Sequence, residues 1–280
     1  MSDFFPFPER EAWKRLEQGL HLTARKGHFA LAYSGGLDSR FLAHASQRLG
    51  LVPELLHVVG PHVSPDETAY ARSWAIARKL SYMEVEADPL ALPLVASGDR
   101  ERCYACKREL FSLLRRQTDL PLCDGTNASD AGHYRPGTRA VRELCVRSPL
   151  ADAGLTKMMI HHLAASTGME DPDQKPHPCL LTRLPYGMKP ERRLLQLLAD
   201  GEKAMRILLE DIGSQDPDFR LRFVDDRLEL HVVSEIEALL SPELRERMLH
   251  HLVLLAPELP SPCIRGIENL SGFFDREQST

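Results

Sequence analysis

The sequence lacks any long, uninterrupted run of apolar residues, and its start lacks the pattern of a signal peptide. No apolar stretch reaches the ~20 residues that a helix needs to cross a bilayer. The first residues, Met1-Ser2-Asp3-Phe4-Phe5-Pro6, contain neither the basic start nor the apolar centre of a secretory signal. These two absences predict a cytoplasmic protein without a membrane partner.

The sequence also has no excess of basic residues. Its 280 residues include 35 lysines and arginines against 40 aspartates and glutamates, which gives a formal net charge of -5. Proteins whose main task is to grip nucleic acid usually present a basic face, so this balance counts against a nucleic-acid partner. Because 43% of the residues are apolar, the chain can form the core of one large domain or two modest ones.

Internal repeats and low-complexity tracts are absent as well, and the pattern that is present is one of strands alternating with helices. Short apolar runs predict buried strands, and longer runs with apolar residues at helical spacing predict helices. Such alternation is typical of an α/β fold with a doubly wound, mainly parallel sheet. The predicted helices cover residues 8–26, 40–49, 66–80 and 156–167, and the predicted strands cover 29–33, 55–59, 82–85, 120–123 and 146–148.

The texture of the sequence changes after Gly168. Residues 169–178 contain three prolines and cannot hold a helix, so they mark a domain boundary or an active-site loop. We place the boundary there, with a first domain over residues 1–170 and a smaller α/β domain over 171–280. The second domain is predicted to contain a helix at 190–212, a strand pair at 219–224 and 228–233, and a closing helix at 242–255.

The most informative segment is Ser34-Gly35-Gly36-Leu37-Asp38-Ser39, between the first predicted strand and its helix. Two glycines let the backbone turn tightly and point N–H groups at one anion, and the following helix adds its positive end. Ser34 and Ser39 add hydroxyl donors, while Asp38 can either cap the helix or bind Mg²⁺. The segment is not a Walker A loop, because no Gly-Lys-Ser/Thr ends it. An ordinary strand-to-helix turn stays open, but the coincidence of these features favours a pyrophosphate cradle and hence ATP.

A second candidate nucleotide contact follows the strand predicted at 120–123. The segment Asp124-Gly125-Thr126-Asn127 begins where that strand ends. Since the carboxyl ends of parallel strands meet at one edge of a sheet, Gly125 and Asn127 are expected beside the phosphate loop. A plain Asp-Gly turn explains the same residues equally well.

Six cysteines in a reducing compartment are better explained as thiols or metal ligands than as disulfides. Cys103 and Cys106 form a Cys-x-x-Cys pair ahead of a helix-like run, a spacing that can bind one metal centre. Cys179 lies in the proline-rich loop, where a thiol is more often chemical than structural. A redox pair and a structural zinc site completed by His177 and Cys179 stay open, although no second Cys-x-x-Cys is present. The other three are interpreted as packing residues: Cys123, Cys145 and Cys263.

Together these segments resemble a known family. The sequence Ser34-Gly35-Gly36-Leu37-Asp38-Ser39 is similar to the Ser-Gly-Gly-x-Asp-Ser fingerprint of the PP-loop ATP pyrophosphatases. Over about residues 12–235 the chain further resembles the LarE family of ATP-dependent sulfur transferases. The matching segments are 102–107, 124–127 with 134–137, 147–150 with 154–157, and 179–187.

The resemblance implies a PP-loop fold of the adenine nucleotide alpha hydrolase-like type and a reaction that uses ATP and Mg²⁺. ATP would adenylate a carboxylate of pyridinium-3,5-biscarboxylic acid mononucleotide, with release of pyrophosphate. Sulfur would then replace AMP and give a thiocarboxylate, which matures into the nickel-pincer nucleotide of lactate racemase. The resemblance also implies an assembly of several copies of the chain.

The resemblance further implies the source of the sulfur. In one version of the family a single cysteine, matched here by Cys179, forms a thioester and gives up its own sulfur. In the other version three cysteines hold a 4Fe–4S cluster, whose fourth iron is open for a hydrosulfide. Cys103, Cys106 and Cys179 stand at the three matching positions, so the chain resembles the cluster version, although three cysteines permit either.

The resemblance also implies a set of substrate-binding residues. Guanidinium groups suit an anionic nucleotide, and an acid beside them suits the metal and phosphates. A solvated surface is the alternative for the members of this set that lie on the predicted strand and on the long helix. The set consists of Arg183, Arg220, Arg222 and Glu202.

The chain departs from the family pattern at two places. His177-Pro178 precede Cys179 where small residues are usual, and residues 225–231 replace a segment that usually carries an arginine and an acid. The exact substrate therefore stays open. Two other functions also stay open, namely a PP-loop tRNA thiolase and a non-catalytic nucleotide-binding protein with structural zinc.

Overall fold

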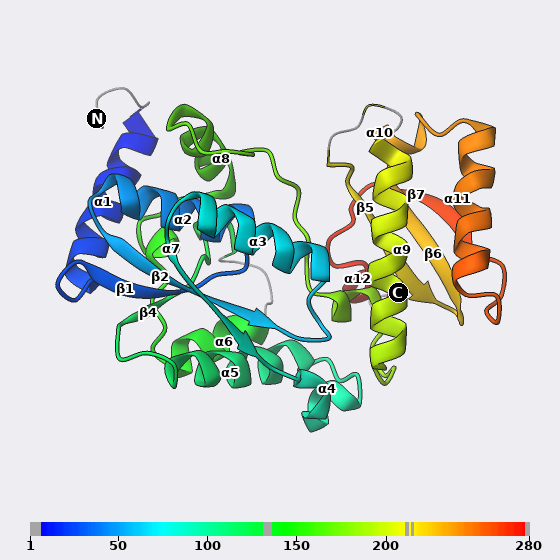
Figure 1. The fold of residues 1–280 in the computed structure, drawn as a ribbon, viewed down its shortest axis with the longest axis horizontal. Coiled ribbons are helices and arrows are strands. Elements are labelled where there is room, and N and C mark those ends of the chain that lie inside the picture. Colours follow the sequence, from blue (N-terminus) through cyan, green and yellow to red (C-terminus); the bar gives the residue numbers. More distant parts are fainter. Residues whose placement is uncertain (1–6, 131–135, 211–212, 214–215, 278–280) are drawn as a thin grey trace. The chain divides into compact units, whose positions relative to one another are not determined.

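The computed structural model describes residues 7–130, 136–210, 213 and 216–277. Contacts within the chain divide it into two compact units (Figure 1). Unit 1 comprises residues 1–60, 67–92 and 101–174, and unit 2 comprises residues 61–66, 93–100 and 175–280. The last crossing from one unit to the other lies in the proline-rich segment 169–178.

Unit 1 is built on a four-stranded sheet in which every neighbouring pair is parallel. The strand order is β3-β2-β1-β4, so the first strand lies in the interior of the sheet. Parallel neighbours need crossover connections, which helices usually supply. The strands are β1 (His28–Ala32), β2 (Val52–Val59), β3 (Ser81–Glu86) and β4 (Leu122–Cys123).

Helices cover both faces of this sheet, as a doubly wound fold requires. Helices α2 and α3 lie on one side of the sheet, and α5 and α6 lie on the other (Figure 1). The predicted α/β fold class, with its parallel sheet, is thereby confirmed. The helices are α1 (Phe7–Thr23), α2 (Leu37–Arg48), α3 (Pro65–Ala77), α5 (Arg102–Arg115), α6 (Pro136–Glu143), α7 (Pro149–Asp152) and α8 (Lys157–Ser166), with the short turns η2 (Pro89–Ala91) and η3 (Ala128–Asp130).

Unit 2 contains a smaller, mixed sheet in the order β5-β6-β7. Strands β5 and β6 form an antiparallel hairpin, and β7 pairs in parallel with the other edge of β6. The hairpin turn consists of Asp225 and Asp226, whose φ angles of 48° and 60° suit Asp better than most residues. The elements are α4 (Pro93–Ala96), η4 (Leu180–Arg183), α9 (Arg192–Glu210), β5 (Phe219–Val224), β6 (Arg227–Val233), α10 (Ser234–Glu237), α11 (Pro242–Leu255), β7 (Cys263–Ile267) and α12 (Phe273–Glu277).

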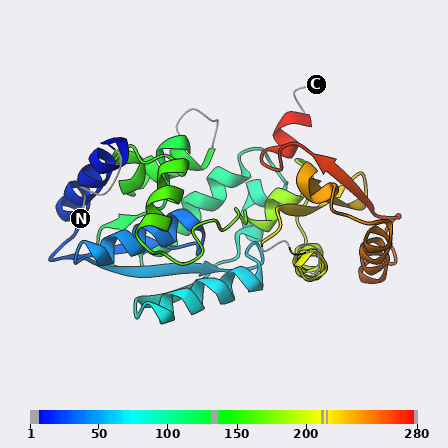
Figure 2. The ribbon, with the colours of Figure 1, turned by 90° about the horizontal axis from the view of Figure 1, so that it is seen from above.

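The two faces of the unit 2 sheet differ in character. Leu221 of β5 packs against α9, where Gly201 permits a close approach because an added Cβ would lie 2.3 Å from Leu221 Cδ2. The opposite face carries charged side chains, and the strand register places Arg222 opposite Glu229. Figure 2 shows α9 and α11 on one side of this sheet and α12 on the other.

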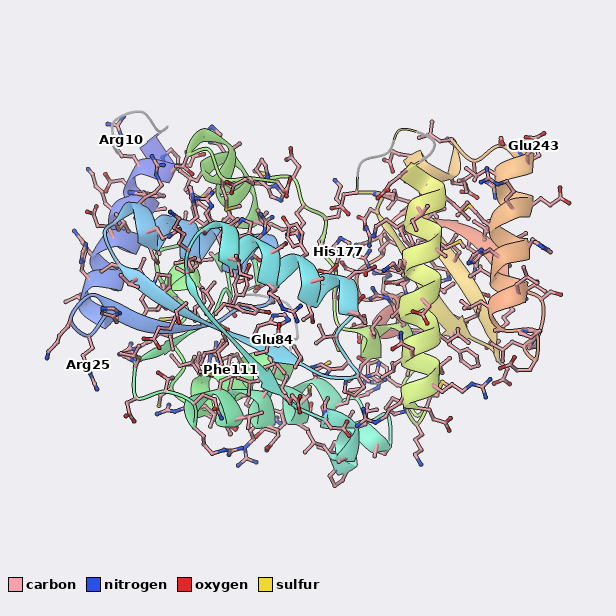
Figure 3. All side chains as sticks on the ribbon, in the orientation of Figure 1. Arg10, Arg25, Glu84, Phe111, His177 and Glu243 are labelled. Carbon is pink, nitrogen blue, oxygen red and sulfur yellow. The ribbon has the colours of Figure 1, made fainter. Side chains whose placement is uncertain are left out.

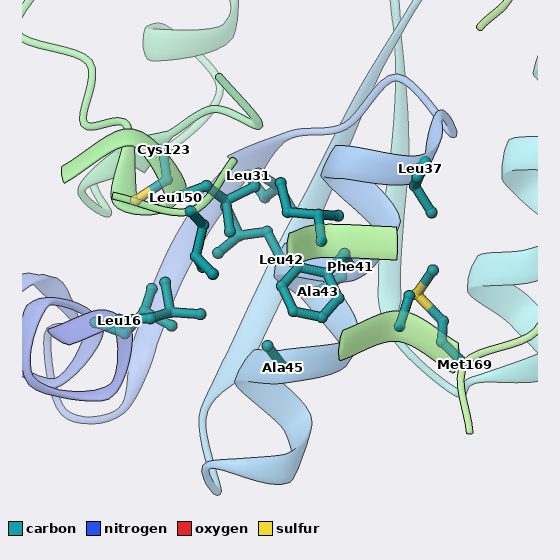
Figure 4. Close-up of a cluster of buried hydrophobic side chains, with 14 of the residues drawn as sticks. Leu16, Leu31, Leu37, Phe41, Leu42, Ala43, Ala45, Cys123, Leu150 and Met169 are labelled. Atoms are coloured by element: carbon teal, nitrogen blue, oxygen red, sulfur yellow. The ribbon is translucent and has the colours of Figure 1, made fainter. Parts of the chain in front are cut away.

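The core of unit 1 lies on both faces of its sheet. On one face Phe111 of α5, which is labelled in Figure 3, belongs to a cluster with Ala30, Leu56 and Leu122 of the strands. On the other face the side chains of α1, α2, α7 and α8 contribute to a larger cluster, part of which Figure 4 shows. Alternate residues of β1 supply the two faces, since Ala30 belongs to the first cluster and Leu31 to the second.

The helix predicted at 156–167 is confirmed together with both of its ends. Thr156 is the N-cap of α8, and its hydroxyl oxygen accepts a hydrogen bond of 3.3 Å from the Met159 amide. Gly168 follows the helix with a φ of 71°, the left-handed conformation in which helices commonly end.

Two predicted features of the fold are wrong. The strand predicted at 146–148 is reduced to a single bridge between Cys123 and Arg147, because a proline starts α7 directly afterwards. The helix predicted at 242–255 is observed as α11 but does not close the unit, since β7 and α12 follow it. Strand β7 contains a glycine and an arginine and so lacks the apolar alternation that predicts a strand.

None of the helices in the described part of the chain has the length and apolar character needed to span a membrane.

Candidate functional site

The loop between β1 and α2 folds as a compact turn whose geometry depends on its glycines. Gly35 has a φ of 81° and lies against α3, where an added Cβ would be 2.7 Å from Ala71 Cβ. Gly36 is the N-cap of α2, and its amide is 3.3 Å from Ser34 Oγ. The Ser39 hydroxyl donates to the Gly36 carbonyl at 3.1 Å and lies 3.2 Å from Ser34 Oγ. The first N–H groups of α2 have no partner within the helix, so this loop can present them to an anion.

Asp38 does not cap α2, since the N-cap Gly36 has no side chain and no side-chain bond closes the helix end. The Asn127 amide donates to Asp38 Oδ2 at 3.1 Å. Among the described residues, no group donates to the buried Oδ1 of Asp38. Burial raises the pKa of Asp38, although the Asn127 bond and the charges of Lys157 and His161 oppose that shift. A buried carboxylate oxygen without a donor is a group that a metal ion or a ligand could satisfy.

The segment after β4 lies directly against this loop. A Cβ added at Gly125 would be 3.0 Å from the Ser39 nitrogen, so the two backbones approach closely there. The Asp124 carboxylate accepts bonds from the Thr126 hydroxyl at 2.6 Å and from the Ser148 hydroxyl at 2.8 Å, and thereby holds the turn. The structure thus brings Gly125 and Asn127 to the predicted phosphate loop, and their contact with a nucleotide stays a prediction.

Lys157 and His161 of α8 are close enough for their charges to act on Asp38, and neither is among the predicted site residues. Lys157 is the first residue of α8, where a cation faces the positive end of the helix dipole. Its amide donates to the Ser129 hydroxyl oxygen at 3.0 Å, which ties α8 to the turn after β4. The sequence signal that could have identified Lys157 is a lysine at the start of a predicted helix whose first turn contains no acidic residue.

Cys103 and Cys106 lie within α5, which begins at Arg102, and not ahead of the helix as predicted. Residues three apart share a helix face, so both thiols can face one metal centre. Cys103 is exposed and Cys106 is buried. Of the segment 134–137, which resembles the family, Tyr134 and Arg135 lie outside the described residues, and residues 136–137 begin α6.

The remaining thiols differ in their surroundings. Cys123 is fully buried in the core, and burial raises its pKa to about 12, in agreement with a packing role. Cys145 is exposed at a φ of 52°, so the prediction of a packing role is wrong for this residue. Cys263 is half-buried on β7.

Cys179 precedes η4 in unit 2 and is half-buried. Its carbonyl oxygen accepts bonds from the Thr182 amide at 3.0 Å and from the Thr182 hydroxyl at 2.8 Å. Within the described ranges, no three or more His, Cys, Asp or Glu side chains form a group that could hold a metal. Cys103 and Cys106 belong to unit 1, so the three-cysteine ligand set stays a prediction.

Arg183 and Glu202 form a buried, two-pronged ion pair in unit 2. Arg183 Nε is 2.6 Å from Glu202 Oε1, and Arg183 Nη2 is 3.1 Å from Oε2. Glu202 Oε1 also accepts the Leu221 amide of β5 at 3.0 Å. Burial alone would raise the pKa of Glu202, but Arg183 and Arg220 hold it below its usual range. The alternative of a solvated helix residue is therefore wrong for Glu202.

Arg220 and Arg222 are 5% and 3% exposed on β5, so the alternative of a solvated surface is wrong for both. Arg220 Nη1 donates to Asp218 Oδ1 at 3.1 Å, and Nη2 donates to the carbonyl of Pro176. Arg222 donates to His231 Nδ1 at 2.6 Å, while its buried Nε has no acceptor in the described part of the chain. Burial, helped by the nearby charges of Arg183 and Arg220, lowers the pKa of Arg222 to about 9.

The segment that departs from the family pattern lies beside Arg222. Glu229 and His231 are both fully buried, with His231 Nε2 donating to Glu229 Oε2 at 2.9 Å. Burial would raise the pKa of Glu229, but the bonds from His231 and Arg265 lower it to about 2. Burial lowers the pKa of His231 to about 4, so this imidazole is neutral near pH 7.

Comparisons with known proteins give three relatives, and no protein-family model matches the chain. The chain is 32% identical over 186 residues to the uncharacterized protein slr1717 of Synechocystis, a match that covers 64% of this chain and 68% of the relative. It is 26% identical over 199 residues to the uncharacterized protein MJ0830 of Methanocaldococcus jannaschii, over 69% and 75% of the two chains. It is also 26% identical over 209 residues to the pyridinium-3,5-bisthiocarboxylic acid mononucleotide synthase of Lactiplantibacillus plantarum, over 71% and 73%.

Proposed function

We propose that this chain, which belongs to the same protein family as slr1717 of Synechocystis, is an ATP-dependent sulfur transferase of the LarE type. The name of the Lactiplantibacillus relative describes a product with two thiocarboxylates on a pyridinium ring. The proposed substrate is therefore the corresponding pyridinium-3,5-biscarboxylic acid mononucleotide, for nickel-pincer nucleotide synthesis. The observation that carries the proposal is the buried Asp38 Oδ1, which has no donor among the described residues, beside a two-glycine loop at the end of β1.

The proposed first step is adenylation of the substrate carboxylate. A carboxylate oxygen attacks the α-phosphorus of ATP, the bond from that phosphorus to the bridging oxygen breaks, and pyrophosphate leaves. The loop amides and the Ser34 and Ser39 hydroxyls would hold the leaving phosphates. Mg²⁺ bound at Asp38 would supply positive charge to the leaving group. Lys157 is placed to contribute a second positive charge, because its field already reaches Asp38.

The proposed second step replaces AMP by sulfur. Cys103, Cys106 and Cys179 would hold a 4Fe–4S cluster, which would supply a hydrosulfide whose sulfur bonds to the acyl carbon as the bond from that carbon to the AMP oxygen breaks. In the alternative, the Cys179 thiol would displace AMP to give a thioester, and its Cβ–Sγ bond would then break with loss of the Cα proton, which leaves dehydroalanine and the thiocarboxylate. Cys103 and Cys106, one helical turn apart in α5, fit two ligands of such a centre. In both versions the role of Thr182 is to fix the backbone of Cys179 through its carbonyl oxygen.

The anionic part of the substrate is proposed to bind at the charged face of the unit 2 sheet. Arg222 is the guanidinium best suited to it, because its Nε lacks an acceptor among the described residues. Arg183 and Arg220 already bond to protein groups, so they would shape the site and bind through their remaining donors, while the Glu202 carboxylate would hold Arg183 in place.

The direct test is to incubate oxygen-free protein with MgATP and pyridinium-3,5-biscarboxylic acid mononucleotide and to follow pyrophosphate, AMP and thiocarboxylate by mass spectrometry. We expect Asp38→Asn to lower pyrophosphate release by about 100-fold, since a ligand of the Mg²⁺ that would stabilise the leaving charge is lost. The melting temperature should not fall, because burial disfavours the ionised Asp38 carboxylate. Asp119→Asn, at an exposed position of the same unit, is the matched control. Pyrophosphate release at the native rate in Asp38→Asn would contradict the role of Asp38. If the native chain does not consume ATP, the proposed function is contradicted.

Iron, sulfide and zinc analysis of the native chain and of Cys179→Ala distinguishes the sulfur sources. About four iron atoms per chain with matching sulfide, lost in the variant, would favour the cluster. A metal-free protein would favour sulfur from Cys179 itself, and stoichiometric zinc would contradict both versions.

A further inference from the structure

Three side chains of unit 2 form a closed ring of hydrogen bonds just ahead of Cys179. Asp216, in the connection between α9 and β5, accepts bonds from Arg206 Nη1 at 3.0 Å and from His177 Nε2 at 3.1 Å. Arg206 Nη2 lies 3.0 Å from His177 Nδ1 and closes the ring. His177, labelled in Figure 3, is two residues before Cys179.

The chemistry of the ring determines the state of the imidazole. A guanidinium can only donate, so His177 Nδ1 must accept the bond from Arg206. The proton of the neutral ring therefore lies on Nε2, which donates to Asp216 Oδ1. Each bond in the ring thus has one donor and one acceptor, and the ring fixes the rotation of His177.

The same groups also hold the backbone of this segment. The Lys175 amide donates to Asp216 Oδ2 at 2.6 Å, so both oxygens of Asp216 bind residues that lead to Cys179. Arg220 of β5 donates to the carbonyl of Pro176. Arg206 is itself held in place, since its guanidinium carbon lies 5.5 Å from the centre of the Phe219 ring.

The backbone that follows Cys179 is held by a second, separate set of bonds. Thr182 donates to the Cys179 carbonyl, and Arg183 Nη1 donates to the Thr182 hydroxyl at 2.8 Å. Arg183 is in turn paired with Glu202, and the Leu180 amide donates to the His62 carbonyl at 2.9 Å. Cys179 therefore lies between two anchored stretches, and the first is held mainly by Asp216 and Arg206, which the family resemblance does not single out.

We propose that Asp216, together with Arg206 and His177, is a positioning device that fixes the backbone leading into Cys179 and so sets the place of its sulfur. The consequence for catalysis rests on the proposed sulfur transfer, whereas the anchoring itself does not. Asp216 would act through Cys179 on the sulfur step, whereas the phosphate loop of unit 1 would perform adenylation. Loss of the ring should therefore uncouple the second step from the first.

The test uses Asp216→Ala and, as a second way to open the ring, Arg206→Gln in the full-length chain. Hydrogen–deuterium exchange of the peptide covering residues 175–182 and the alkylation rate of Cys179, mapped by mass spectrometry, report the anchor without any substrate. We expect both to rise by about tenfold or more, as loss of a hydrogen bond to a charged group permits. Glu246→Ala, an exposed acid of α11, is the control and should change neither.

The coupling of the two steps is the readout that a purely structural role would not move. With MgATP and pyridinium-3,5-biscarboxylic acid mononucleotide, the thiocarboxylate formed per pyrophosphate released should fall about tenfold, while pyrophosphate release stays at the native rate. Asp216→Asn retains one carbonyl acceptor and should recover part of the coupling. If hydrogen–deuterium exchange and Cys179 alkylation stay at the native rates in both ring variants, the proposed anchoring is overturned. If exchange becomes faster but the thiocarboxylate formed per pyrophosphate stays at the native value, the role of the ring in sulfur transfer is overturned. A native chain that releases no pyrophosphate would instead contradict the proposed function, and exchange would still decide the anchor.

Discussion

In unit 1 the sheet is mainly apolar on both faces and the candidate polar groups gather beyond the strand ends, whereas in unit 2 one sheet face carries a cluster of buried charged side chains. Leu31 and Leu55 represent the first arrangement, and both are fully buried. Arg222, Glu229 and His231 represent the second, and they are buried as well. The difference follows from topology, because a parallel sheet covered by helices on both faces has no position inside it for charge.

This contrast separates two uses of buried polar groups. At the edge of the unit 1 sheet Asp38 retains a buried oxygen without a donor among the described residues, which leaves it available to a ligand. In unit 2 the charges mostly satisfy one another, as Glu229 does with Arg227, Arg265 and His231. Buried charges that are paired in this way specify geometry more than they add affinity or stability. Unit 1 thus retains a carboxylate oxygen that a cation or a donor could satisfy, whereas unit 2 uses its buried charges to hold its own segments in place.

The largest expected effect concerns the contribution of Glu229 to the stability of unit 2. Glu229→Ala leaves Arg227, Arg265 and His231 without their common acceptor, so we expect the free energy of unfolding to fall by about 3–5 kcal/mol. Urea unfolding followed by far-UV circular dichroism measures this change. Trp13 and Trp74 are the only two tryptophans and both lie in unit 1, so their fluorescence follows that unit separately.

An exposed acid of the same unit provides the control for this result. Glu246→Ala removes an acid that is exposed on α11 and should shift the free energy of unfolding by less than about 0.5 kcal/mol. An equally small effect at Glu229 would mean that the charges of unit 2 are dispensable, and the contrast between the units would be lost.

A smaller effect is expected where two backbones meet at the edge of unit 1. Gly125→Ala places a Cβ 3.0 Å from the Ser39 nitrogen, which must displace the phosphate loop slightly. We expect ATP affinity, measured by calorimetry, to fall by about tenfold, because small misplacements of a preorganised site are costly. Gly19→Ala of α1 is the control, since nothing lies within 4 Å of the added Cβ, and it should stabilise the helix by about 0.5–1 kcal/mol. Native ATP affinity in Gly125→Ala would show that the loop does not bind the nucleotide.

The smallest expected effect concerns acid sensitivity in unit 1. His44 donates from Nε2 to Thr167 Oγ1, since the Thr167 hydroxyl itself donates to Leu163, and burial with the charges of Arg78 and Arg48 lowers the pKa of His44 to about 4. The unfolded chain then takes up the proton first, near pH 6.5, so the free energy of unfolding decreases as pH falls from about 6.5 towards 4.

His44→Gln should remove this contribution. Between pH 6.5 and 4.5 the variant should lose about 1–2 kcal/mol less stability than the native chain, as judged by tryptophan fluorescence in urea. His231, whose pKa is also lowered to about 4, gives the corresponding test in unit 2 by circular dichroism. Identical pH profiles for the native chain and His44→Gln would contradict a buried, neutral His44.

Local features of the fold were predictable because their causes lie within a few residues. The Thr156 cap, the break at 169–178 and the positive φ of Gly35 all depend on neighbours in the chain. Strand β7 was not predictable from periodicity, since it forms by pairing with β6 about 34 residues earlier, as Glu229 opposite Cys263 shows. The proximity of Lys157 to Asp38 was hidden for the same reason, because the two residues are distant in the sequence.

By itself the sequence determined the α/β class, the parallel sheet and the position of a two-glycine loop between a strand and a helix, since periodicity and turn chemistry act over short distances. Only the tertiary structure decided that Arg220 and Arg222 are buried and that Asp38 retains an oxygen without a donor in the described chain. It alone also joined Asp216 to the segment of Cys179. These outcomes depend on desolvation and on partners far along the chain, and the type of a single residue carries no information about either.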